Sequence, residues 1–128
     1  MQNCKLRVNI NKPVSEVFQF ALDPNNTPLW VDSIVEEKVN EIPTKVGTIY
    51  RNINKEGIWS EYLVTKFDQN KMFEFVASDK NYHVKYTLTP VSDSSCELEY
   101  FEWVENGEIE APFTIQVLEK LKGLLEAK

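Results

Sequence analysis

The feature that most constrains the fold is a long run of short alternating segments between residues 32 and 105. In the clearest segment, residues 82–90, apolar and aromatic side chains occupy every second position: Tyr82, Val84, Tyr86 and Leu88. This period of two is typical of a half-buried β-strand. The turn-like stretches between segments, such as residues 54–57, are long enough for hairpins but too short for helical crossovers. The pattern therefore predicts an antiparallel sheet.

A further strand and three helices are predicted on either side of this run. Residues 4–10 alternate like a strand. Pro13 suits a first helical turn, and the proline after Asp23 ends the helix that follows. A very short helix is expected at residues 27–30. The last helix is expected over residues 111–127, with an apolar stripe made by Phe113, Val117, Leu118, Leu121, Leu124 and Leu125.

The length and composition of the chain are those of one folded domain. Its 128 residues are near the commonest domain size, and 42% of them are hydrophobic. We therefore expect a single α+β domain spanning residues 1–128, with about seven strands. No apolar run approaches the roughly 20 residues that a membrane-spanning helix needs. The first residues show no apolar signal-peptide core, so we expect a cytoplasmic protein.

The charge of the chain argues against two kinds of partner. The formal net charge is −6, and the lysines at 85, 120 and 122 are scattered among acids. Nucleic-acid binding requires a basic stripe that neutralises phosphates, and anionic membranes also attract basic surfaces. We therefore predict neither a nucleic-acid partner nor a membrane partner. The sequence is compatible with a homodimer.

The cysteine and histidine content argues against a disulfide and against a metal site. Cys4 and Cys96 are 92 positions apart, and in a cytoplasmic protein they are expected to be free thiols. One histidine and two separated cysteines do not supply a Cys/His zinc site. The sequence also has no phosphate loop and no dinucleotide-binding fingerprint, so no metal and no cofactor are predicted.

Several short motifs occur in an order that resembles a known superfamily. They are Pro13-x-x-x-Val17-Phe18, Asp23-Pro24, Pro28-x-Trp30, Val46-Gly47-Thr48 and Tyr86-x-Leu88-x-Pro90. Together with the amphipathic helix at the end, they make nearly the whole chain similar to the SRPBCC superfamily, the START and polyketide cyclase/dehydrase-like helix-grip proteins. Each motif is weak by itself, and the resemblance rests on their order and spacing.

The resemblance implies a strongly bent sheet that grips the last helix, with two short helices after the first strand closing one end. It also implies a cavity between the concave face of the sheet and that helix. Members of the superfamily bind lipids, sterols, hormones or polyketides, and some are cyclases, but no catalytic set is common to all. We therefore expect a small, largely apolar molecule in the cavity. Two alternatives are a cyclase or dehydratase type of enzyme and an interaction module without a ligand.

The alternation predicts which side chains face the interior. Apolar side chains there usually pack only against one another, whereas a buried phenol seeks a hydrogen-bond partner and can orient a ligand. The candidate ligand-binding residues are Tyr50, Tyr62, Phe73, Phe75, Tyr86, Tyr100, Phe113, Val117 and Leu121.

Glu102 is the candidate that distinguishes an enzyme from a binder. Continuing the alternation of Leu98 and Tyr100 aims its carboxylate inward, where it could act as an acid or base together with Tyr86. The alternative is a β-bulge after Tyr100, which would turn Glu102 outward and bury the aromatic side chains on either side of it. The single histidine, His83, shares its face with Lys85 and is expected to be exposed to solvent.

Overall fold

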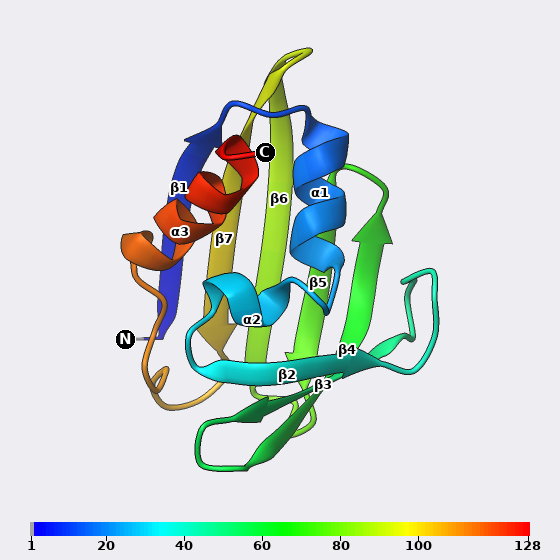
Figure 1. The fold of residues 1–128 in the computed structure, drawn as a ribbon. Coiled ribbons are helices and arrows are strands. Elements are labelled where there is room, and N and C mark those ends of the chain that lie inside the picture. Colours follow the sequence, from blue (N-terminus) through cyan, green and yellow to red (C-terminus); the bar gives the residue numbers. More distant parts are fainter. Residues whose placement is uncertain (1) are drawn as a thin grey trace.

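The computed structural model describes residues 2–128, which form a seven-stranded antiparallel sheet with three helices (Figure 1). The strand order is β1-β7-β6-β5-β4-β3-β2, so β1 and β2 are the two edges. The strands are β1 (Asn3–Ile10), β2 (Ile34–Val39), β3 (Ile49–Asn54), β4 (Trp59–Asp68), β5 (Met72–Ala77), β6 (Tyr82–Ser92) and β7 (Ser95–Val104). The predicted α+β fold with about seven strands is confirmed.

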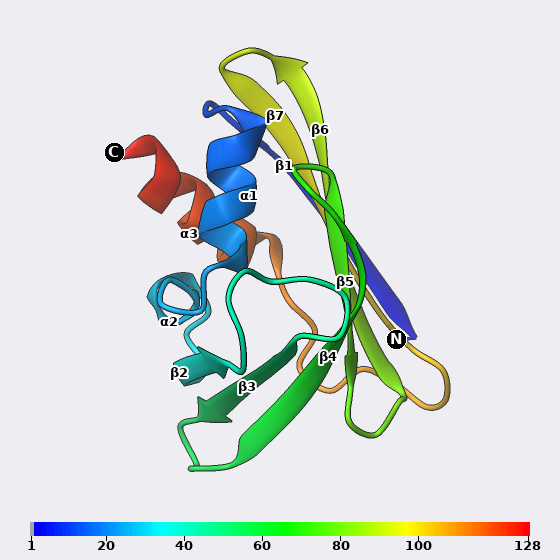
Figure 2. The ribbon, with the colours of Figure 1, turned by 90° about the vertical axis from the view of Figure 1, so that its right-hand side faces the viewer.

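The helices are α1 (Val14–Leu22), α2 (Thr27–Trp30) and α3 (Ile115–Glu126). All three lie on the concave side of the sheet (Figures 1 and 2). The predicted pair of short helices after the first strand is confirmed. Within residues 2–128, none of the helices is long and apolar enough to cross a membrane.

The sheet is strongly bent, and the bend decides where space is left inside the fold. Figure 2 shows that β2 and β3 turn toward the helices and away from the plane of β6 and β7. The pairing of β4 with β5 shifts register between Val64 and Lys66. A bulge of this kind kinks a strand and increases its twist, which lets one sheet form both walls of a hollow.

The helix α3 provides the main cover for one end of the concave face. Its side chains Leu118, Leu121 and Leu125 are fully buried against the sheet, where α3 packs on β1. The helix begins at Ile115, four residues later than predicted, because the backbone before it is not helical. The residue before Pro112 has a φ of 48°, and Thr114 at the N-cap is extended. Phe113 therefore lies in a connecting segment rather than in the helix.

Strand β7 is regular through Glu102, so the predicted alternation holds and the alternative bulge does not occur. Glu102 is opposite Cys4 of β1 and Val84 of β6 in an unbroken register, and only 1% of its surface is exposed. Phe101 and Trp103 lie on the opposite, convex face, where their rings stack with centroids 4.9 Å apart.

The expectation for His83 was wrong in one respect. Its ring is on the convex face, as expected, but it stacks on Trp103 at 4.7 Å and is largely covered. Its Nε2 lies 2.9 Å from a carboxylate oxygen of Glu105. Trp103, which is opposite His83 on the neighbouring strand, covers the imidazole ring even though both residues are on the outer face of the sheet.

Both cysteines are free thiols, as predicted. In the β1–β7 ladder Cys4 is opposite Glu102, whereas Cys96 is opposite Ile10. The six-residue offset corresponds to roughly 20 Å along the strands, and a disulfide tolerates only about 7 Å between Cα atoms. The two thiols therefore cannot be joined within one chain of this fold.

The burial of α3 predicts a large difference between two neighbouring substitutions. Leu121→Ala leaves a cavity under the helix and should cost about 2–5 kcal/mol, lowering the thermal midpoint by roughly 10 °C. Glu119→Ala, on the exposed side of the same helix, should change the midpoint little. Thermal unfolding followed by circular dichroism measures both. Equal effects would contradict the proposed packing.

Candidate ligand-binding cavity

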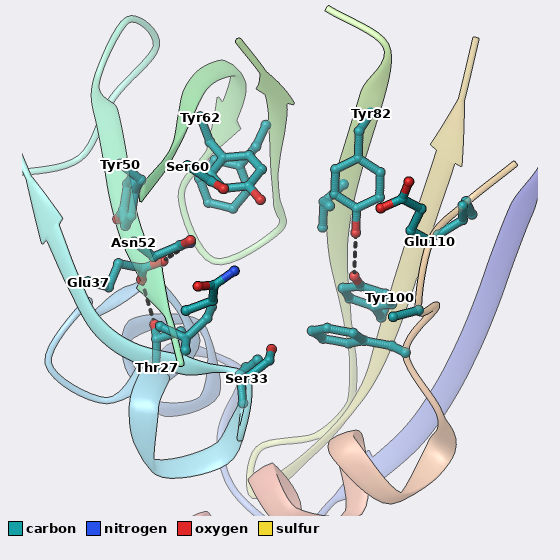
Figure 3. Close-up of a pocket in the computed structure, with 18 of the residues that line it drawn as sticks. Thr27, Ser33, Glu37, Tyr50, Asn52, Ser60, Tyr62, Tyr82, Tyr100 and Glu110 are labelled. Carbon is teal, nitrogen blue, oxygen red and sulfur yellow. Dashed lines mark hydrogen bonds between the residues drawn. The ribbon is translucent and has the colours of Figure 1, made fainter. Parts of the chain in front are cut away.

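A cavity of about 580 Å³ lies between the bent end of the sheet and the strands that face it (Figure 3). One wall comes from β2, β3 and β4. The other comes from β6, β7 and the segment 108–113, and α2 contributes Trp30. The volume is within the range of small-molecule sites. Six of the nine predicted ligand-binding residues line it: Tyr50, Tyr62, Phe75, Tyr86, Tyr100 and Phe113.

The remaining three predicted residues lie outside the cavity lining, which corrects their expected position. Phe73 is buried in the core, where its ring stacks on Tyr86 and meets Phe18 edge to face at 5.4 Å. Leu121, on the inner side of α3, is fully buried, and Val117 of the same helix packs against the core. The alternation identified the correct face of the sheet, but it did not show which end of that face the helix covers.

The tyrosines of the chain are concentrated in the cavity. All five line it, whereas only two of the seven phenylalanines do. The cross-strand pairing explains this clustering, because Tyr50 is opposite Tyr62 on one wall and Tyr86 is opposite Tyr100 on the other. Phenols supply aromatic surface together with a hydrogen-bonding group. The lining is therefore aromatic but not purely apolar.

The phenol hydroxyls differ in whether a protein group already binds them. Tyr50 donates to the backbone carbonyl of Leu22 at 2.7 Å. Tyr82 contacts a Glu102 oxygen at 3.3 Å, and the Tyr100 hydroxyl lies 3.4 Å from the Tyr82 hydroxyl. Since the single proton of Tyr82 goes to Glu102, Tyr100 donates to Tyr82. These three hydroxyls are satisfied within the protein.

Ser60 hydrogen-bonds to the Tyr62 hydroxyl, so Tyr86 is the exception among the five. Its side chain lines the cavity and is only 8% exposed, yet its hydroxyl has no hydrogen-bond partner among residues 2–128. Burial, followed by the charge of Glu37, raises the pKa of Tyr86 well above its usual range. The hydroxyl therefore stays protonated at neutral pH. A phenol hydroxyl that faces the cavity without a protein partner is free to donate to, or accept from, a bound molecule.

Glu37 is a cavity residue that the sequence analysis missed. A β-bulge between Ile34 and Glu36 shifts the register of β2, so that both Ile34 and Glu37 face the cavity. Thr27 Oγ1 donates to its Oε1 at 2.6 Å, and Asn52 Nδ2 donates to its Oε2 at 3.2 Å (Figure 3). One sequence pattern could have indicated that Glu37 faces inward: Glu37 and Val39 alternate with Lys38, which is exposed.

The surroundings of Glu37 raise its pKa. Burial has the largest effect, and the hydrogen bonds from Thr27 and Asn52 offset part of it. No Lys, Arg or His nitrogen of the described chain lies within 4 Å of its carboxylate. Glu37 is thus a half-buried carboxylate whose hydrogen-bond partners are both neutral.

Glu102 is buried but does not line the cavity, which corrects its predicted place. Its Oε2 accepts a hydrogen bond from the backbone N–H of Phe113 at 3.1 Å, and its Oε1 accepts from Tyr82. The backbone carbonyl of Phe113 also contacts Cys4 Sγ at 3.6 Å. These contacts hold the segment before α3 against β7. The predicted catalytic pairing of Glu102 with Tyr86 is not formed.

No family model and no curated protein matches this chain. Solved structures do match. A START superfamily protein from Mycobacterium smegmatis has a TM-score of 0.76 and 13% identity, over 99% of each chain. The chain has an SRPBCC-type fold. A Mesorhizobium loti protein shares this fold with a TM-score of 0.78 and 16% identity, over 98% of each chain.

The di-domain ARO/CYC protein BexL also shares the SRPBCC-type fold. The likeness has a TM-score of 0.66 and 14% identity, and it covers 81% of this chain and 36% of BexL. These identities are low, so the likeness concerns the arrangement of strands and helices. The SRPBCC-type fold that the sequence motifs indicated is thereby confirmed, and its helix-grip architecture is the one that encloses the cavity.

The raised pKa of Glu37 predicts an unusual stability profile. A carboxyl whose folded pKa exceeds its unfolded pKa contributes stability below the unfolded pKa, and this contribution is lost as pH rises through the folded pKa. In Glu37→Gln the amide oxygen can accept from Asn52, and the Thr27 hydroxyl can turn to accept from the new amide N–H, so both contacts survive. The variant should therefore have a higher thermal midpoint at pH 7, by an amount that corresponds to about 1.4 kcal/mol for each unit of pKa shift. The advantage should vanish near pH 4. An unchanged or lower midpoint at pH 7 would contradict this.

The contacts of Glu102 predict that the corresponding substitution, Glu102→Gln, destabilises the protein. Glu102→Gln keeps the size of the side chain but leaves one acceptor where two are used, so a buried donor loses its partner. The expected cost is about 1–3 kcal/mol in urea unfolding. Glu97→Gln, at an exposed position of the same strand, is the matched control and should be nearly neutral. If the two variants had the same free energy of unfolding, the contacts of Glu102 would not stabilise the fold.

Proposed function

We propose that this protein binds a small molecule in the cavity, with an apolar ring system against the aromatic side chains and polar groups toward Glu37 and Tyr86. The observation that carries the proposal is the unpartnered hydroxyl of Tyr86 inside a 580 Å³ space. A hydroxyl that faces the cavity and has no protein partner is available for a hydrogen bond to a ligand, and a few such polar groups orient the ligands of apolar pockets.

The shape of the interior favours a binder over a module without a ligand. Aromatic side chains line the space but do not fill it. Trp30 meets Tyr86 and Phe113 edge to face, with centroids 6.3 Å from each. The ring centroid of Phe75 on β5 lies 5.1 Å from that of Tyr50 on β3, with β4 between the two strands. Rings that support one another in this way form a preorganised lining, which lowers the conformational cost of binding.

The position of Glu102 favours binding over turnover. A catalytic acid must come within hydrogen-bond reach of the group on which it acts. Both oxygens of Glu102 are already engaged, one by Tyr82 and one by the backbone N–H of Phe113, and Glu102 itself does not line the cavity. Among the similar structures, one is a START superfamily protein and another is an ARO/CYC protein, which supports a cavity that holds small molecules.

A substitution that fills the cavity tests the proposal. Ser60 is half-buried on β4 and points into the space (Figure 3), so Ser60→Trp should occupy it. With 2-naphthylmethanol as a fluorescent probe, the variant should bind at least about tenfold more weakly than the wild type. Glu61→Trp, on the convex face, is the matched control and should bind normally.

Ser33→Trp provides a second blocking variant, from the loop after α2. Circular dichroism should show that each variant is folded. If the wild type does not bind the probe, or if both folded blocking variants bind it as well as the wild type, the proposed cavity function is wrong.

A further inference from the structure

The charged residues that line the cavity all have the same sign. They are Glu37, Asp79, Glu108 and Glu110, and no Lys, Arg or His of the part described lines the space. Asp79 and Glu110 are exposed, and they stand at the rim, whereas Glu37 lies deeper. Figure 3 shows Glu110 beside Tyr82, across the cavity from Glu37. Carboxylates around an aromatic space create a negative potential that attracts cations and repels anions.

Glu37 is able to accept further hydrogen bonds. Each carboxylate oxygen can accept two, and each accepts one here, from Thr27 or from Asn52. Glu37 is half-buried, and a carboxylate that is partly removed from water gains from a cationic partner, because its charge is less well solvated there. Since residues 2–128 supply no such cation at Glu37, a ligand could supply it.

The aromatic lining suits a cation as well. Ring faces attract ammonium groups through the negative charge of the π system. Elsewhere in this protein lysines already use ring faces in this way: Lys128 lies 4.7 Å from the Phe20 centroid, and Lys5 lies 5.0 Å from that of Phe101. None of the lysine–ring pairs in the described chain involves a ring of the cavity.

From these three observations we infer that the ligand is an organic cation, with an amine or quaternary ammonium group bound by Glu37 and an apolar or aromatic body held between the tyrosines. This inference rests on the proposed ligand-binding function and names the class of ligand. A bare metal ion fits less well, because no cluster of three or more His, Cys, Asp or Glu side chains suited to a metal occurs among residues 2–128.

Three probes of similar size and different charge separate the inference from the function on which it rests. They are 2-naphthylmethylammonium, 2-naphthylmethanol and 2-naphthylacetate, titrated by fluorescence at pH 7. The cation should bind at least about tenfold more tightly than the neutral alcohol, as expected for a hydrogen bond to a charged group, and the anion should bind most weakly.

Substitution of Glu37 assigns the preference to one side chain. In Glu37→Gln the ratio of cation affinity to alcohol affinity should fall to about one. Glu36→Gln is the matched control, because it removes the same charge from the next residue of β2, which is exposed. The control should keep the wild-type ratio.

The outcomes distinguish two kinds of failure. If the alcohol binds and Ser60→Trp blocks it, but the cation has no advantage, the inference is wrong and the proposed function stands. If Glu36→Gln and Glu37→Gln reduce the ratio equally, the preference reflects the net charge of the protein and not the cavity, and the inference is again wrong. If none of the probes binds, both fail.

Discussion

The hollow in this fold depends on a mismatch in length between the last helix and the strands it covers. With 12 residues, α3 is about 18 Å long, whereas the 11 residues of β6 extend over roughly 36 Å. Figure 1 shows α1 and α3 over one end of the sheet, with α2 below them. The three buried leucines of α3 fill the covered end. At the other end the bent sheet and the segment before α3 enclose a space that side chains do not fill.

The buried Glu102 and the half-buried Glu37 are used in different ways in this architecture. Glu102 joins strand β7 to the segment that precedes α3, and its oxygens are both satisfied by groups of the protein. Glu37 is contacted only by neutral donors, and burial raises its pKa. The first therefore supports the wall of the cavity. The second carries a cost in stability that a structural role does not explain, which is the pattern expected where function and stability compete.

Much of the fold could be predicted from the sequence, because alternation and turn residues are local signals. They identified the sheet, the three helices and the inward tyrosines. They did not identify the start of α3, which depends on the backbone at residues 111–114. For the same reason, Phe73 and Leu121 were expected in the cavity but lie in the core, since a period of two indicates the face of a strand and not the depth of a side chain under a helix.

Glu37 and Glu102 show a second limit of sequence patterns. Side chains along a strand alternate between the two faces of the sheet, so a single bulge moves every following side chain to the opposite face. The regular register of β7 kept Glu102 inward, as the alternation predicted. The bulge in β2 placed Glu37 in the cavity, and the position of such a bulge depends on pairing with β3, which is a tertiary property.

The most direct measurement of the central claim is an NMR titration of the tyrosine rings. All five tyrosines line the cavity, whereas Phe101 and Trp103 lie on the convex face. Protein with ¹³C-labelled aromatic rings would be titrated with 2-naphthylmethylammonium. The account predicts saturable shifts of the ring signals of Tyr50, Tyr62 and Tyr86, with the signals of Phe101 and Trp103 unchanged. Binding that shifts only the convex-face rings would contradict it.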